Sequence, residues 1–263
     1  MKYKFIASAL FIPTLVMVGW AVIESEWKVE KYKGYTLYYQ QEDANHKNEY
    51  QSMIDTGMQS VKSFFGEEYK NNFTITLHPD RTSLDSTWRK DWNMPSFKSE
   101  CWMVASGVAT RMDIIAPAKW EQHSCEHHYS DKEKTLQLIT HELFHVYHGQ
   151  LNVSPDFSHV NNVDWFVEGL ATYASGQCDS SRIASIKKMI AGNKVPASLD
   201  KFWMGPMKYG LSGSVVLYID QTYGRKKLKE LLRFNTLTQI LEALGTTETD
   251  LISNWKSYIE RNT

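Results

Sequence analysis

The sequence predicts an α+β fold in which a mixed α/β lobe with a small sheet precedes a mainly helical lobe. Before residue 130, short alternating runs of apolar and polar residues, typical of strands, are interspersed with helical patterns. After residue 150 only helical patterns follow. With 263 residues the chain is long enough to bury a large core, in one domain or in two closely packed lobes. We expect these lobes to comprise residues 27–150 and 151–263.

Residues 1–26 are expected to be a signal peptide or an N-terminal membrane anchor. Two lysines lie among the first four residues, residues 5–23 are uncharged and largely apolar, and two glutamates follow. A basic start before an apolar segment directs the rest of a chain out of the cytoplasm. Gly19 and Ala21 are small residues that suit cleavage of a signal peptide, although there is no Ala-x-Ala site. Residues 5–23 are also just long enough to span a bilayer as an uncleaved anchor. Either outcome gives an extracytoplasmic protein that is secreted, periplasmic or anchored to the membrane.

The first lobe is expected to alternate between strands and helices. The alternating patterns predict strands at residues 35–40, 73–78, 101–105 and 111–116, the last two on either side of Gly107. The helical patterns predict an amphipathic helix at 49–65, ended by Gly66, and a short helix at 84–92.

The clearest helix is expected at residues 130–150. Ser130 and Glu133 form a capping-box pattern at its start, and Gly149 is expected to end it. No proline interrupts the segment. Apolar residues recur at helical spacing and form a buried stripe of Leu136, Ile139, Leu143, Phe144 and Tyr147.

This helix carries the segment HELFH at 141–145. Residues four apart lie on one face of an α-helix, so His141 and His145 can bind the same metal ion. Glu142 lies about 100° round the helix and is left free to act on a metal-bound water. This is the layout of a zinc hydrolase in which Glu142 works as general base and acid, and an amide is the expected target.

The third ligand is expected to be Glu168, in the amphipathic helical segment 164–176. The alternative interpretation is a solvated surface glutamate, but large apolar residues on both sides of Glu168 are unusual for such a position. His148 shares the face of His141 but lies about 10 Å along the helix axis from it, too far to share one ion. His159, in a loop-like segment, is a weaker candidate.

The segments HELFHVYHGQ and WFVEGLATYASG together resemble the gluzincin metallopeptidases, in particular the peptidase MA-like proteins with a HExxH…EGLA arrangement. The later segments YGLSGSVVLYIDQTYGRKKLKELL and LEALGTTETDLISNWKSYI are similar to the helical half of that family. The resemblance covers about residues 130–260 and implies a zincin-like fold with an active-site cleft between the lobes. It also implies one bound Zn²⁺ ion, with Glu142 as general base and acid and with the ligands His141, His145 and Glu168.

Three further assignments depend on this resemblance. Tyr209 corresponds to the phenol that stabilises the oxyanion in many gluzincins, although a core aromatic with its hydroxyl at the surface would explain it equally well. Thr172 stands where thermolysin-like enzymes have an aspartate, and it could orient His141. Residues 106–110 would form the cleft edge that pairs with the substrate backbone, and an ordinary hairpin turn is the alternative.

The second lobe is expected to be helical, with loops at residues 192–196 and 205–210. The helices that follow segment 164–176 are expected at residues 181–191, 211–223, 225–234, 236–244 and 247–261.

The three cysteines allow at most one disulfide within the chain. A bond between Cys101 and Cys125 is expected as a brace before the helix at 130–150, and three reduced thiols are the alternative. The segment HSCEHH at 123–128 is rich in metal-ligating residues. Because these residues are crowded and lack a helical or hairpin frame, we expect a polar loop there and not a second metal site.

The charge balance bears on partners. The 29 basic and 30 acidic residues give a net charge of −1, which argues against a nucleic-acid binder.

The function expected from HELFH and Glu168 is zinc-dependent hydrolysis of a protein or peptide substrate. Two alternatives stay open: a non-catalytic zinc-containing binding or scaffold module of the envelope, and a zinc hydrolase of non-peptide amides such as a cell-wall link. Glu142 argues against the first, because a structural zinc site normally closes its fourth position and needs no such carboxylate.

Overall fold

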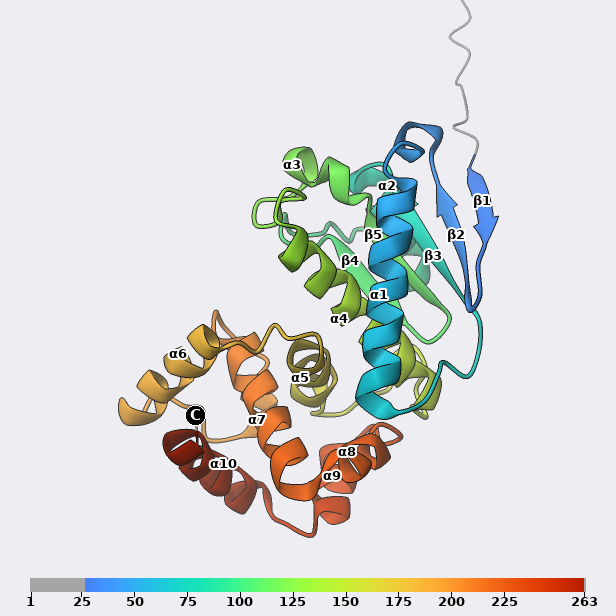
Figure 1. Ribbon diagram of the computed structural model, residues 1–263. Helices are drawn as coiled ribbons and strands as arrows, with labels where there is room; N and C mark the ends of the chain where they lie inside the picture. The colour runs from blue at the N-terminus through green and yellow to red at the C-terminus, as the bar shows by residue number, and fades with distance from the viewer. Residues whose placement is uncertain (1–26, 263) are drawn as a thin grey trace, which may run out of the picture.

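The computed structural model describes residues 27–262 and confirms the α+β fold. A five-stranded sheet with helices on both faces forms the first half, and helices alone form the second half (Figure 1). The expected leader, residues 1–26, lies outside the described residues. Within the part of the chain that is described, no helix is long and apolar enough to cross a membrane.

The sheet is mixed, with strands in the order β1, β2, β3, β5, β4. The two inner pairs, β2 with β3 and β3 with β5, are parallel, and the two outer pairs are antiparallel. Strand β4 is thus the outermost strand on its side. The strand bounds are Lys28–Lys31 for β1, Tyr35–Tyr39 for β2, Phe73–His78 for β3, Ala105–Val108 for β4 and Arg111–Ile115 for β5.

The sheet differs from the sequence expectation in three places. Strand β1 was not expected, and the strand expected at 101–105 begins only at Ala105. Gly107, expected between two strands, lies inside β4. A Cβ atom at Gly107 would come within 2.3 Å of the carbonyl oxygen of Glu142. The glycine therefore marks a close approach of β4 to the helix that carries Glu142, and not a turn.

The helices of the first half cover opposite faces of the sheet (Figure 1). On one face, the hydroxyl of Tyr35 on β2 donates a hydrogen bond to Asp55 on α1, and α4 packs beside α1. On the other face, the indole of Trp88 on α2 donates to Ser106 on β4. These helices are α1 (Lys47–Phe65), α2 (Arg81–Asp91), α3 (Trp120–His123) and α4 (Lys132–Leu151).

Helix α4 differs from the expectation at both ends. Asp131, and not Ser130, caps its N-terminus, because the Asp131 carboxylate accepts the backbone N–H of Lys134. The helix also continues past Gly149. A Cβ atom at Gly149 would come within 2.6 Å of the backbone nitrogen of Ala109, so this glycine permits close packing against the loop after β4.

The helical half is built around the close packing of α5 on α7. A Cβ atom at Gly169 on α5 would lie 2.5 Å from the carbonyl oxygen of Ser212 on α7, which explains the glycine at this position. The helices are α5 (Asp164–Ala174), α6 (Ser180–Ala191), α7 (Lys208–Tyr223), α8 (Arg225–Leu231), α9 (Leu237–Leu244) and α10 (Glu248–Asn262). Short 3₁₀ turns occur at Gln41–Asp43, Pro117–Lys119 and Leu199–Lys201.

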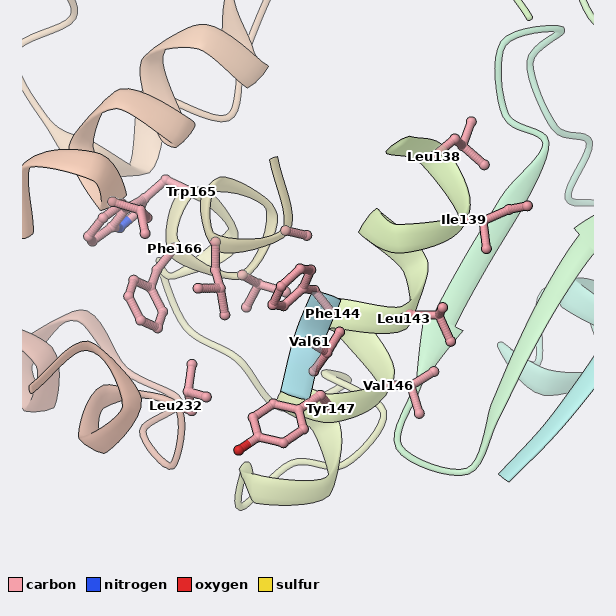
Figure 2. Close-up of a cluster of buried hydrophobic side chains, with 14 of the residues drawn as sticks. Val61, Leu138, Ile139, Leu143, Phe144, Val146, Tyr147, Trp165, Phe166 and Leu232 are labelled. Atoms are coloured by element: carbon pink, nitrogen blue, oxygen red, sulfur yellow. The ribbon is translucent and has the colours of Figure 1, made fainter. Parts of the chain in front are cut away.

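One apolar core joins the two halves through α4. Phe144 on α4 packs edge-on against Phe64 and Phe65 of α1. Figure 2 shows Phe144 and Val61 in the same buried cluster as Phe166 of α5. Because burying one such side chain contributes about 1.5–3 kcal/mol, this cluster holds α1, α4 and α5 in a fixed relation. The site described next depends on that relation.

Candidate metal centre

Helix α4 presents the two predicted histidines from its middle. Its apolar residues are buried against α1 and the sheet, which fixes the rotation of the helix about its axis. The side chains of His141 and His145 are then brought together, with their Nε2 atoms 3.0 Å apart. Both residues are only 6% exposed. The i, i+4 spacing therefore produces the shared face that the sequence predicts.

Glu168 reaches the histidine pair from the neighbouring helix α5. Its Oε2 atom lies 3.4 Å from Nε2 of His141 and 3.5 Å from Nε2 of His145. The flanking residues Trp165 and Phe166 are fully buried, so they anchor α5 and hold Glu168 at this position. Among the described residues this is the one group of three or more His, Cys, Asp or Glu side chains whose ligand atoms converge.

The three converging atoms fit a zinc ion. Ligands bound at about 2.0–2.1 Å in a tetrahedral arrangement lie about 3.3–3.5 Å from one another, close to the separations found here. Two imidazole nitrogens and one carboxylate are also a typical donor set for catalytic zinc. Burial alone would raise the pKa of Glu168, but the adjacent imidazoles His145 and His141 lower it well below its usual range. Glu168 is thus a carboxylate, which a cation requires of its ligand.

Gln177 orients His141, a contact that the sequence did not reveal. Its Oε1 atom lies 3.0 Å from Nδ1 of His141, so the Nδ1–H donates to the amide and Nε2 keeps a lone pair for a metal. Thr172, expected in this role, is fully buried, and its hydroxyl has no hydrogen-bond partner among the described residues. Its methyl group instead faces Gly213 of α7. Gln177 follows Gly176, whose φ of +80° turns the chain back towards α4.

Glu142 lies beside the ligands but is not one of them. Burial raises the pKa of its carboxyl group to about 7, while the adjacent His141 lowers it less and Glu168 adds a smaller increase. The residue is 8% exposed. A carboxyl group with a pKa near neutrality can both accept and donate a proton, which is what a general base and acid requires.

Tyr209 is located at the edge of the site. It lies in the first turn of α7, and not in the loop expected at 205–210. Its ring packs edge-on against the ring of His141, with the centroids 6.4 Å apart. Burial raises the pKa of the phenol, and the charges of Glu168 and Glu142 raise it further. The phenol therefore stays protonated at neutral pH and can donate a hydrogen bond.

The remaining histidine candidates lie apart from this group. His148 is buried against the rings of Phe157 and Phe166, so it contributes to packing and not to the ligand group. His159 is exposed in the loop before α5.

The segment HSCEHH at 123–128 does not form a metal site in the described structure. His128 pairs with Glu121, and His127 is hydrogen-bonded to the carbonyl of Trp102. Cys125 forms a disulfide with Cys101, as expected, and Cys178 is a free thiol.

Only the comparison with solved structures finds proteins similar to this chain. No protein-family model and no curated protein sequence matches the chain. Among solved structures, the chain is similar to one titled "Structure of native yeast LTA4 hydrolase", with 13% sequence identity and a TM-score of 0.48. The match covers 89% of this chain and 38% of the other, so the chain spans less than two fifths of that protein. The function is therefore inferred from the geometry of the site.

Proposed function

We propose that this protein is an extracytoplasmic zinc metallopeptidase of the gluzincin type. The observation that carries the proposal is the convergence of three ligand atoms from α4 and α5, with the carboxyl group of Glu142 beside them. His141, His145 and Glu168 would hold a zinc ion. When bound, zinc supplies a Lewis acid that polarises a carbonyl and lowers the pKa of a water molecule.

The proton transfers are assigned to Glu142. Its carboxylate takes a proton from the attacking water and then delivers it to the leaving amine, so one group acts as base and then as acid. The near-neutral pKa of Glu142 supports both roles. The phenol of Tyr209 donates a hydrogen bond to the developing oxyanion, in line with its position beside His141. No serine or cysteine nucleophile is needed for this reaction.

A peptide is the favoured substrate because of strand β4. It is the outermost strand of the sheet on its side, and Gly107 brings it against the turn of α4 that contains Glu142. An outer strand can add an extended peptide through main-chain hydrogen bonds, which would align the peptide along α4. Substrate pairing with β4 is thus part of the proposal.

The extracytoplasmic location rests on the sequence of residues 1–26, with a basic start before the apolar segment 5–23. The disulfide between Cys101 and Cys125 supports it, because such bonds persist mainly in oxidising compartments. The apolar segment is the proposed membrane attachment if it is not cleaved.

The deciding experiment compares Glu142→Gln with the matched control Glu133→Gln, an exposed glutamate on the same helix. Zinc content would be measured by mass spectrometry, and cleavage by digestion of a broad peptide library. We expect one zinc per chain in all proteins and a loss of cleavage of about 10²–10⁴-fold in Glu142→Gln alone.

The other outcomes separate the alternatives. Full cleavage by Glu142→Gln would refute the mechanism, and absence of stoichiometric metal would refute the site. Zinc binding without cleavage of any peptide by the wild type would leave a zinc-containing scaffold or a hydrolase of non-peptide amides. An assay on amide-linked cell-wall fragments would then decide between those two.

A further inference from the structure

A series of hydrogen-bonded side chains, Ser83, His78 and Asp113, lies on the face of the sheet away from the metal centre. The hydroxyl of Ser83, in the first turn of α2, is 2.9 Å from Nδ1 of His78 at the end of β3. Nε2 of His78 is 2.9 Å from Oδ1 of Asp113 on β5. Asp113 pairs with Ser106 in the sheet register, and Ser106 accepts the indole N–H of Trp88 on α2. The sheet therefore separates these three side chains from the metal centre.

The order of the groups matches a serine nucleophile with its base and its orienting acid. His78 and Asp113 are each 2% exposed, and Nε of Arg111 lies 3.0 Å from the second carboxylate oxygen of Asp113. The carboxylate holds the proton of His78 on Nε2, so Nδ1 is left to accept the proton of Ser83. Both distances fall in the range of about 2.6–3.2 Å required between a nucleophile, its base and the orienting group.

An open hollow of about 740 Å³ adjoins this series, and Ser83, His78 and Asp113 are all among the residues that line it. Its volume is within the range of about 300–1,000 Å³ of small-molecule sites. The ring of Trp27 forms part of its wall and packs edge-on against His78, with the centroids 6.1 Å apart. Most other lining side chains are polar or charged, among them Thr76, Thr87 and Lys90.

The start of α2 adds a favourable electrostatic environment. The carboxylate of Asp80 caps the helix by accepting the backbone N–H of Ser83 at 2.8 Å, which fixes the first turn. Ser83 thus lies at the positive end of the helix dipole, where negative charge on its oxygen and on an adjacent carbonyl oxygen is stabilised.

We propose that Ser83, with His78 as base and Asp113 as the group that orients it, is the nucleophile of a second, metal-independent site that hydrolyses small acyl esters of polar molecules. Oγ of Ser83 bonds to the acyl carbon while its proton passes to Nδ1 of His78. The ester C–O bond breaks, and the same proton is delivered to the departing alcohol. Water then hydrolyses the acyl-serine by the same route, which releases the carboxylic acid and restores Ser83.

The test is covalent labelling by an alkyl fluorophosphonate, in which the serine oxygen displaces fluoride from phosphorus. It uses the full chain carrying Glu142→Gln, so that the metal centre does not contribute hydrolysis. We expect one adduct, mapped by mass spectrometry to Ser83, and its loss in Ser83→Ala and in His78→Asn. Ser60→Ala is the matched control, since Ser60 is an exposed serine on α1, on the other face of the sheet.

Hydrolysis of p-nitrophenyl acetate gives the second measurement. We expect the Glu142→Gln protein to hydrolyse this ester, with a loss of at least about 10²-fold on adding Ser83→Ala and no loss on adding Ser60→Ala. A folded protein that forms no Ser83 adduct, or ester hydrolysis that survives Ser83→Ala, would overturn the proposal and leave a purely structural hydrogen-bond chain. Neither result depends on whether the protein cleaves peptides.

Discussion

The two histidine clusters on opposite sides of the sheet differ in how their polar atoms are satisfied. At the metal centre the Nε2 atoms of His141 and His145 and the carboxylate of Glu168 converge on one point, and each offers a lone pair. On the other side, donors and acceptors alternate from Ser83 through His78 to Asp113. The first arrangement needs a cation to satisfy it, whereas the second is joined by its own hydrogen bonds, and the other carboxylate oxygen of Asp113 is left to an ion pair with Arg111. This difference predicts how each cluster responds to substitution.

The largest expected effect follows from removing the carboxylate ligand. Replacing Glu168 with Ala leaves two imidazoles as the protein ligands, so zinc affinity should fall by more than about 10²-fold, since loss of an outer partner alone costs about 10–100-fold. The measurement is zinc content after dialysis against a graded series of chelator concentrations. Stoichiometric zinc in Glu168→Ala under conditions that retain it in the wild type would show that Glu168 is not a ligand.

A smaller effect is expected at Gln177, which holds the tautomer of His141. Gln177→Ala should weaken zinc binding by about 10–100-fold. Gln177→Glu, which keeps an acceptor at the same reach, should recover most of the affinity. Both variants should fold like the wild type by circular dichroism, because Gln177 lies outside the apolar core. Equal losses in the two variants would contradict an orienting role.

A pH-dependent contribution to stability is expected from His148, which belongs to neither cluster. Burial, with a smaller contribution from His145, lowers the pKa of His148 to about 3. The unfolded chain, with a histidine pKa of about 6.5, therefore binds a proton that the folded protein does not, and stability falls as the pH falls below 6.5. Between pH 7 and pH 5 the contribution of His148 to the free energy of unfolding should drop by about 2 kcal/mol, whereas Glu142, whose pKa is raised, contributes in the opposite sense.

His148→Leu removes the titration while keeping the side chain apolar. The comparison uses chemical denaturation of both proteins at the two pH values in the presence of chelator, so that zinc release does not contribute. Parallel stability curves for the wild type and His148→Leu would refute the assignment.

The smallest effect on stability is expected at Ser83. Ser83→Ala removes one hydrogen bond beside an open hollow, where water can replace the lost donor, so the free energy of unfolding should fall by only about 0.5–1.5 kcal/mol. Zinc content should not change. A loss of zinc in Ser83→Ala would show that the two sides of the sheet are coupled.

Local sequence patterns correctly predicted the features that depend on residues close to one another in the sequence. The spacing of His141 and His145, the helical periodicity around them and the apolar residues around Glu168 predicted three side chains that the structure brings together. The α+β class also followed from the change of period along the chain. Two of the failures share a cause: Gly149 and Gly107, expected to end a helix and to lie between strands, serve close packing between elements distant in sequence.

Helical spacing and side-chain chemistry act over a few residues, so the sequence predicted most of the elements and the ligand types. The tertiary structure alone set which partners meet across long separations. It selected Gln177 over Thr172 for His141, because the left-handed turn at Gly176 brings the chain back and packing against α7 directs Thr172 away. It also brought Ser83 and His78 to Asp113, since β3 and β5 pair directly and α2 begins beside them. Such contacts depend on strand order and helix packing, which no local pattern records.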